Sequence, residues 1–445
     1  MADKAAQAGW LERRFGLAAR GSSARTEVLA GATSFLTMAY IIVVNPAILS
    51  QAGMPVAGVA AATCLAAGVA SILMGLFANV PLALAPGMGL NAYFAFTVVG
   101  QMGVPWPVAL ACVFVSGLAF LLLTLTGVRQ LIIAVIPPHL LAAIAGGIGL
   151  FLGLIGLKEA GIVIASPATL VSLGPLTAPG PALALFGLAV TGILGAAGVR
   201  GAILVGITLT TLVAWFTGQI GTPPSDYRLD ALAGTAFRLD LAGLFTGAAG
   251  IGLLEIIFVF LFVDVFDNVG TLVAVTRRAG LVDAAGRITG LNRILGVDAV
   301  AAMLGALAGT STVTAYVESA AGVAAGGRTG LTAVVTGLLF LAAMVVAPWA
   351  QLVPLAATAP ALIVVGAMML APLAEIAWDE PAQAIPAFLT VAIIPLSFSI
   401  ANGLAFGIVA HAAFRLARRE FTRTDLFLFT LAALFVARFA WMAAA

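Results

Sequence analysis

Four polar residues recur on one face of an otherwise apolar stretch, IIFVFLFVDVFDNVGTLVAV. Asp264, Asp267, Asn268 and Thr271 are spaced i, i+3, i+4 and i+7, which places them on one side of an α-helix. A carboxylate in apolar surroundings is costly unless it is paired or protonated. Because the stretch offers no Lys or Arg at that depth, desolvation and mutual repulsion are expected to favour the protonated form of at least one aspartate.

Glu318 is the other acid that stands isolated in an apolar context, in the run GTSTVTAYVESAAGVAAGG. We expect Asp267 and Glu318 to accept hydrogen bonds from a ligand, to exchange a proton, or to do both. A purely structural, hydrogen-bonded role is the alternative for each acid, and it weighs most for Asp264. Asn91 is an amide in a second unusual run, NVPLALAPGMGLNAYFAF, where it either joins the site or caps a helix.

The elements that carry these residues must lie in a bilayer. Of the 445 residues 62% are hydrophobic and only 9% are charged, and the mean hydropathy is +1.16. Soluble domains carry about 25% charged residues, so we predict an all-α polytopic membrane protein. We expect no nucleic-acid partner, although the net charge of +2 says nothing on this point, and no metal cluster, nucleotide loop or catalytic constellation is present. We therefore expect neither an enzyme nor a cofactor.

Apolar runs separated by breakers predict fourteen spanning segments and a tail helix. The first seven lie near 27–48, 57–78, 81–100, 106–126, 137–157, 181–198 and 200–217. The second seven lie near 249–276, 292–309, 310–326, 330–348, 358–373, 384–400 and 401–417, and the tail helix covers 424–442. With the N-terminus inside, sixteen basic residues face the cytoplasm and three face outward, as the positive-inside rule requires. Because seven is odd, the second half is inverted relative to the first.

The two ends of the chain leave alternatives open. Residues 1–26 are polar and basic, with no cleavable signal peptide, and predict either an amphipathic helix on the cytoplasmic leaflet or a solvated tail. The tail helix 424–442 lies either on the membrane surface or against the bundle. Both His139 and His411 fall near the cytoplasmic side or in the last span, so we expect any proton relay to run on carboxylates.

The third span of each half is interrupted. Pro81, Pro86, Gly87 and Gly89 cannot all belong to a continuous helix, and the hydroxyl-rich run Thr310–Thr314 favours an extended strand. Irregular backbone at membrane depth is tolerated only where it is buried in protein or lines a cavity. Two interruptions at matching places therefore predict a binding site between half-helices, with short strands in spans 3 and 10. Ordinary Pro and Gly kinks are the alternative.

Four stretches together resemble the AzgA-like purine permeases of the nucleobase–ascorbate transporter superfamily: LERRFGLAARGSSARTEVLAGATSFLTMAYIIVVNPAIL, ALAPGMGLNAYFAF, FVFLFVDVFDNVGTL and TSTVTAYVESAAG. The resemblance implies proton symport of hypoxanthine, guanine or adenine by an elevator-type movement of a core domain against a gate domain. It also implies an inner-membrane location, the lipid bilayer as surroundings, and a homodimer. The segments would be 1–26 N-terminal, 27–130 and 249–348 core, 131–248 and 349–420 gate, and 421–445 C-terminal.

The resemblance also assigns roles to residues of this chain. Asn91, Asp267, Tyr316, Glu318, Thr271 and Phe94 match substrate-site positions, and Asp264, Asp267 and Glu318 match positions linked to the proton. Aromatic faces at Phe35, Phe94 and Tyr316 would stack on a purine. Three alternatives are a carrier of the same fold for xanthine or uracil, one for an inorganic anion, and a channel. The run AYVESAAG counts against the xanthine branch, and the carboxylates count against an anion.

Overall fold

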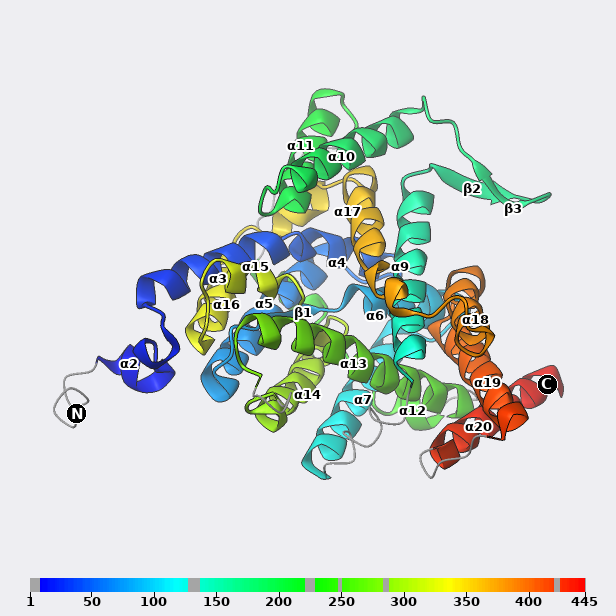
Figure 1. Cartoon of the computed structure of the whole chain (residues 1–445). Helices are drawn as coiled ribbons and strands as arrows, with labels where there is room; N and C mark the ends of the chain where they lie inside the picture. Colours follow the sequence, from blue (N-terminus) through cyan, green and yellow to red (C-terminus); the bar gives the residue numbers. More distant parts are fainter. Residues whose placement is uncertain are drawn as a thin grey trace. The chain divides into compact units, whose positions relative to one another are not determined.

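The computed structural model describes residues 9–126, 137–220, 229–246, 250–282, 288–419 and 425–444, which are mostly helical (Figure 1). The chain divides into two compact units. Unit 1 comprises residues 1–126 and 183–358, and unit 2 comprises 127–182 and 359–445. The predicted core and gate domains divide the chain at other residues, and that assignment stays a prediction.

Unit 1 contains the N-terminal part of the chain up to residue 126 and most of its middle. Its first elements are α2 Trp10–Phe15, η1 Ala18–Arg20, α3 Ala24–Met38, α4 Ile41–Ser50, α5 Val56–Leu73, η2 Met74–Ala78, β1 Leu84–Pro86, α6 Met88–Ala92, η3 Tyr93–Gln101 and α7 Trp106–Thr126. Its later elements are α11 Ala202–Phe216, η4 Leu229–Gly234, α12 Gly243–Thr246, α13 Gly250–Arg278, α14 Leu291–Ala308, β4 Val313–Ala315, α15 Ser319–Ala324, α16 Gly330–Ala343 and η5 Ala347–Leu352.

Unit 2 is smaller and contains α9 Pro138–Glu159, β2 Val163–Ser166, β3 Leu170–Leu173, η6 Ala371–Glu375, α18 Pro381–Ser397, α19 Ile400–Arg418 and α20 Asp425–Ala444. The unit boundary falls inside α10 Pro179–Ala196 and α17 Leu355–Met368. The antiparallel hairpin β2–β3, which follows α9, stands where the sequence suggested only a connection (Figure 1). Its strands are largely exposed, so no hydrophobic run distinguished them from a loop.

Eight helical segments of the described residues are long and apolar enough to cross a bilayer. Four shorter apolar helices, Ala202–Phe216, Gly330–Ala343, Pro381–Ser397 and Leu426–Ala440, accompany them. These segments define a polytopic helical membrane protein, because a spanning helix requires about 20 mostly apolar residues.

Small residues let the helices of unit 1 approach closely. A Cβ added at Gly75 on η2 would lie 2.3 Å from the carbonyl oxygen of Gly330, and one added at Gly330 would lie 2.0 Å from that of Gly75. Gly68 and Gly337 form a second close approach between α5 and α16. Such contacts stabilise helix pairs in membranes, where lipid offers no hydrophobic driving force between helices.

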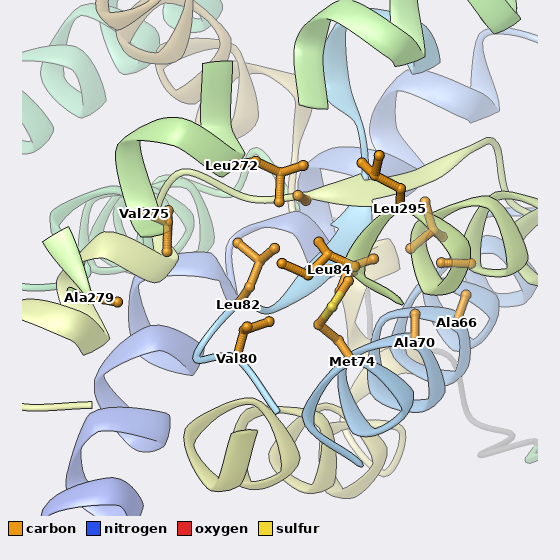
Figure 2. Close-up of a cluster of buried hydrophobic side chains, with 14 of the residues drawn as sticks. Ala66, Ala70, Met74, Val80, Leu82, Leu84, Leu272, Val275, Ala279 and Leu295 are labelled. Carbon is orange, nitrogen blue, oxygen red and sulfur yellow. The ribbon is translucent and has the colours of Figure 1, made fainter. Parts of the chain in front are cut away.

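The interrupted segments meet at the centre of unit 1. β1 pairs antiparallel with β4, although the paired residues Pro86 and Val313 are 227 positions apart in the sequence. Figure 2 shows Leu84 of β1 between Met74 of η2 and Leu272 of α13, within a buried apolar cluster. The cluster fixes the two strands against α5, α13 and α14, so the irregular backbone is buried in protein as the bilayer requires.

Both ends of the described chain pack on helices. Phe15 of α2 is 2% exposed and packs with Leu331 of α16, so the N-terminal helix is docked and not a solvated tail. At the other end, α20 packs on α19. Arg438 donates a hydrogen bond to the side-chain oxygen of Asn402 over 3.1 Å, and Phe439 lies 5.5 Å from Phe406 between ring centroids. The tail helix therefore packs against the bundle.

Candidate functional site

In the antiparallel pair of β1 and β4, called the β1–β4 crossing below, most backbone amide and carbonyl groups have hydrogen-bond partners. The hydroxyl of Ser71 on α5 donates to the carbonyl of Leu84 and accepts from its amide, at 3.1 and 2.9 Å. Ala83 receives a bond from the amide of Tyr316 at 3.1 Å, and its own amide donates to Ser319 Oγ at 3.0 Å. These side chains take the place of further strands, because neither water nor a neighbouring strand is available at membrane depth.

Glu318 stands at the N-cap of α15, immediately after β4, and is half-buried. Its side chain does not cap its own helix. Instead one carboxylate oxygen accepts a hydrogen bond of 2.6 Å from the phenol of Tyr40. The carboxylate of Glu318 is thus positioned by the side chain of Tyr40, and it does not cap the helix that carries it.

Tyr40 is a site residue that the sequence did not single out. The predicted span 27–48 appeared continuous, but α3 ends at Met38 and α4 begins at Ile41, so that Tyr40 lies at a helix break. Tyr40 is fully buried, and its hydroxyl donates to Glu318, 278 residues away in sequence. A buried phenol requires a hydrogen-bond partner, but the sequence alone did not show that Tyr40 is buried or where that partner lies.

Asn91 lies in α6 and is fully buried. Its Nδ2 donates to Asn45 Oδ1 over 2.6 Å, and Asn45 in turn donates to the hydroxyls of Thr63 and Thr310, at 2.7 and 2.8 Å. Asn45 of α4 therefore ties the first interrupted segment to the chain just before β4. The Oδ1 atom of Asn91 has no hydrogen-bond donor among the described residues. This oxygen is therefore available to accept a hydrogen bond from a ligand.

The polar stripe of the sequence lies on α13, which packs against β4, α6 and α15. Asp264 is 4% exposed and Thr271 is half-buried. Asp267 and Asn268 belong to α13, but their side chains lie outside the described residues. Their assigned roles, and those of Asp264 and Thr271, stay predictions.

The aromatic residues named as stacking candidates have partners of their own. Phe94 is fully buried and its ring centroid lies 6.4 Å from that of Phe260 on α13, and Phe35 makes an edge contact with Phe340 at 5.1 Å. Tyr316 is 5% exposed, and its hydroxyl donates to the carbonyl of Pro86 over 2.6 Å. Tyr316 thus joins the segment after β4 to the end of β1, and the stacking roles of Phe35, Phe94 and Tyr316 stay predictions.

Another buried carboxylate, Glu27 of α3, escaped the sequence analysis because it lies at the start of a predicted span. It is fully buried and accepts four hydrogen bonds from the start of α16. The donors are the amides of Arg328, Thr329 and Thr332 at 2.9, 3.3 and 3.2 Å, and the hydroxyl of Thr332 at 2.5 Å. Glu27 is therefore a structural acid.

Unit 2 carries a separate polar cluster around the two histidines. The rings of His139 and His411 lie 4.9 Å apart, and a cavity of about 170 Å³ lies beside them. Glu380, at its rim, accepts from Arg418 at 3.0 Å and from Gln383 at 2.7 Å. These two donors hold the pKa of Glu380 below its ordinary value. No group of three metal-ligating side chains occurs in the part of the chain that the structure describes.

The apolar helices, the two paired interruptions and the acid Glu318 between them are typical of a polytopic helical permease. Residues 25–406 match the family described as "Permease family", and the chain belongs to this family, the nucleobase–ascorbate transporters. It is a transporter and not an enzyme.

Similar proteins cover almost the whole chain. An adenine permease, AdeP of Escherichia coli strain K12, is 46% identical over 92% of this chain and 91% of its own length. The guanine/hypoxanthine permease PbuO of Bacillus subtilis strain 168 is 40% identical over 95% and 98%. Among solved structures, the transmembrane domain of a cyanobacterial bicarbonate transporter, BicA, has a similar fold. Its TM-score is 0.65 at 16% identity, over 86% of this chain and 97% of that one.

Proposed function

We propose that this permease imports purine nucleobases, namely adenine, guanine or hypoxanthine, by proton symport. The observation that carries the proposal is Glu318 at the β1–β4 crossing, held by Tyr40 and not used to cap its own helix. Relatives that share 40–46% of their residues with this chain over most of its length bear the names of adenine and guanine/hypoxanthine permeases.

The chemistry of the crossing suits a neutral purine. A carboxylate accepts hydrogen bonds from ring and exocyclic N–H groups, and such charge-assisted bonds are roughly twice as strong as neutral ones. Protonation of Glu318 would remove an acceptor and add a donor, which couples the occupancy of the site to a proton. Asp264 and Asp267 on α13 are the further candidates for that proton. A carboxylate at this place disfavours an inorganic anion, in spite of the fold shared with a bicarbonate transporter.

The finer architecture belongs to the same proposal. We infer fourteen spans in two inverted repeats of seven, with the N-terminus on the cytoplasmic side of the inner membrane. The sixteen-to-three distribution of basic residues supports this orientation. Alternating access by an elevator movement and a homodimer rest on the family resemblance.

A competition uptake panel tests the substrate. Cells that lack their own purine permeases and express this chain should accumulate radiolabelled adenine or hypoxanthine. Excess unlabelled purine should suppress the uptake, and uracil, sulfate and bicarbonate should not. Suppression by bicarbonate but by no purine would overturn the substrate class. Uptake that is indifferent to a protonophore would overturn the proton coupling alone.

A further inference from the structure

Unit 1 carries a groove of about 690 Å³ that plays no part in the crossing. One wall comes from the end of α5 and from η2, and the other from the first half of α14. The groove is lined by the apolar residues Leu73, Phe77, Val297 and Val300, by Gly296, and by two arginines, Arg14 and Arg293. Phe77 is 63% exposed, so the groove is open to the surroundings of the protein.

The position of Arg14 is fixed by packing, although it lies on a short N-terminal helix. Its neighbour Phe15 is buried against α16, and the side-chain amide of Asn79 donates to the carbonyl of Phe15 over 3.1 Å. Arg20 holds the same segment by donating to the carbonyls of Asn79 and Arg328, at 2.7 and 3.1 Å. The docked helix therefore places a cation at the groove, where it meets Arg293 of α14.

Neither arginine is neutralised by another described residue. Both are exposed, and no ion pair or hydrogen bond joins the guanidinium group of either one to a described side chain or carbonyl. Arg14 lies over the ring of Phe15, 5.8 Å from its centroid. Two uncompensated cations at an apolar groove match a ligand that has an anionic head and a hydrocarbon body.

We propose that this groove binds an anionic phospholipid, with its phosphate between Arg14 and Arg293 and an acyl chain along Phe77, Val297 and Val300. Trp10, on the same helix as Arg14, is 62% exposed. Exposed tryptophans concentrate at the level of lipid headgroups, which is where the two guanidinium groups must lie to meet a phosphate. The lipid would link α2 to α14, two elements that the chain joins only through distant segments.

The test uses purified full-length protein, freed of lipid in a neutral detergent and titrated with phosphatidylglycerol, phosphatidylcholine or inorganic phosphate under native mass spectrometry. Phosphatidylglycerol should bind more tightly than phosphatidylcholine. Replacement of one arginine, as Arg14→Gln or Arg293→Gln, should weaken phosphatidylglycerol about fivefold, and the double replacement roughly thirtyfold, because each basic residue near the headgroups contributes about 1 kcal/mol.

Two further variants separate the groove from general surface charge. Arg13→Gln removes a neighbouring exposed charge that does not line the groove, and it should leave the affinity unchanged. Gly296→Leu keeps both charges but fills the groove, and a Cβ at Gly296 meets no atom within 4 Å, so the protein has room for it. This variant should weaken phosphatidylglycerol as well.

Three outcomes would overturn the proposal. They are equal affinity of the double arginine variant and the wild type, an equal loss with Arg13→Gln, and binding of inorganic phosphate as tight as that of the lipid. Should the double variant fail to fold, Gly296→Leu decides: unchanged lipid affinity in a filled groove excludes the acyl chain from it.

Discussion

Glu27 and Glu318 are two acids of unit 1 that the fold treats in opposite ways. Glu27 is fully buried and accepts four hydrogen bonds from Arg328, Thr329 and Thr332 at the start of α16. Glu318 sits at the start of a helix too, yet its side chain makes no cap bond there. Among the other described side chains, Tyr40 donates a hydrogen bond to the carboxylate of Glu318.

The difference separates a structural acid from one that is available to a ligand. Once its acceptor sites are satisfied by fixed backbone donors, a carboxylate gains nothing from a ligand and loses much on protonation. A carboxylate such as Glu318, which accepts from one other described side chain and is partly exposed, retains acceptor capacity. Depth in the membrane alone does not distinguish the two acids. The number of hydrogen-bond donors to each carboxylate, and the segments that supply these donors, do distinguish them.

The largest effect is expected at Glu318. Glu318→Gln removes the charge but keeps the shape, so uptake of the radiolabelled purine should fall by about 10- to 100-fold, as expected for the loss of charge-assisted hydrogen bonds. The amount of folded protein, measured by size-exclusion chromatography in detergent, should stay within about twofold of the wild type, because neither α15 nor β4 depends on the carboxylate. Uptake above half of the wild-type rate would remove Glu318 from the site.

Glu27→Gln should give the opposite pattern. The new NH2 group replaces one carboxylate oxygen and turns a donor toward either the amide of Arg328 or the amides of Thr329 and Thr332, so we expect a loss of about 2 kcal/mol in stability. A thermal-denaturation assay in detergent should show a lower midpoint, while uptake per folded molecule stays close to wild type. The matched variant Thr332→Val removes only one of the four donors and should cost less. A transport defect without a lower midpoint would show that Glu27 acts in the site.

Tyr40→Phe should have the smallest effect. It deletes one hydrogen bond to Glu318, worth about 1 kcal/mol, and should lower uptake about fivefold. In a Glu318→Gln background, Tyr40→Phe should lower uptake little further, because the Tyr40–Glu318 hydrogen bond is already altered. A double-mutant cycle measures this coupling. Tyr316→Phe gives the comparison, since it deletes a buried phenol hydroxyl that donates to the carbonyl of Pro86. Additive losses from Tyr40→Phe and Glu318→Gln would show that the pair is not coupled.

The sequence carried a good deal of the candidate site. Pro81, Pro86 and the hydroxyl-rich run after Gly309 indicated interrupted segments, and the structure has β1 and β4 within them. Isolation in an apolar run marked Glu318. Asn45 and Tyr40 could not be found in this way, because each lies in an apolar helical stretch without a spacing pattern, and each owes its place to partners 18 to 278 residues away.

By itself the sequence determined that this is a polytopic helical membrane protein and that the segments around Pro86 and after Gly309 depart from a continuous helix. These properties follow from hydropathy and from the local backbone limits of proline, glycine and β-branched residues. Only the tertiary structure decided that β1 pairs with β4, that Tyr40 donates a hydrogen bond to Glu318, and that the carboxylate of Glu27 accepts its hydrogen bonds from the start of α16. Hydrogen bonds between distant segments depend on which elements meet, and local composition does not encode that choice.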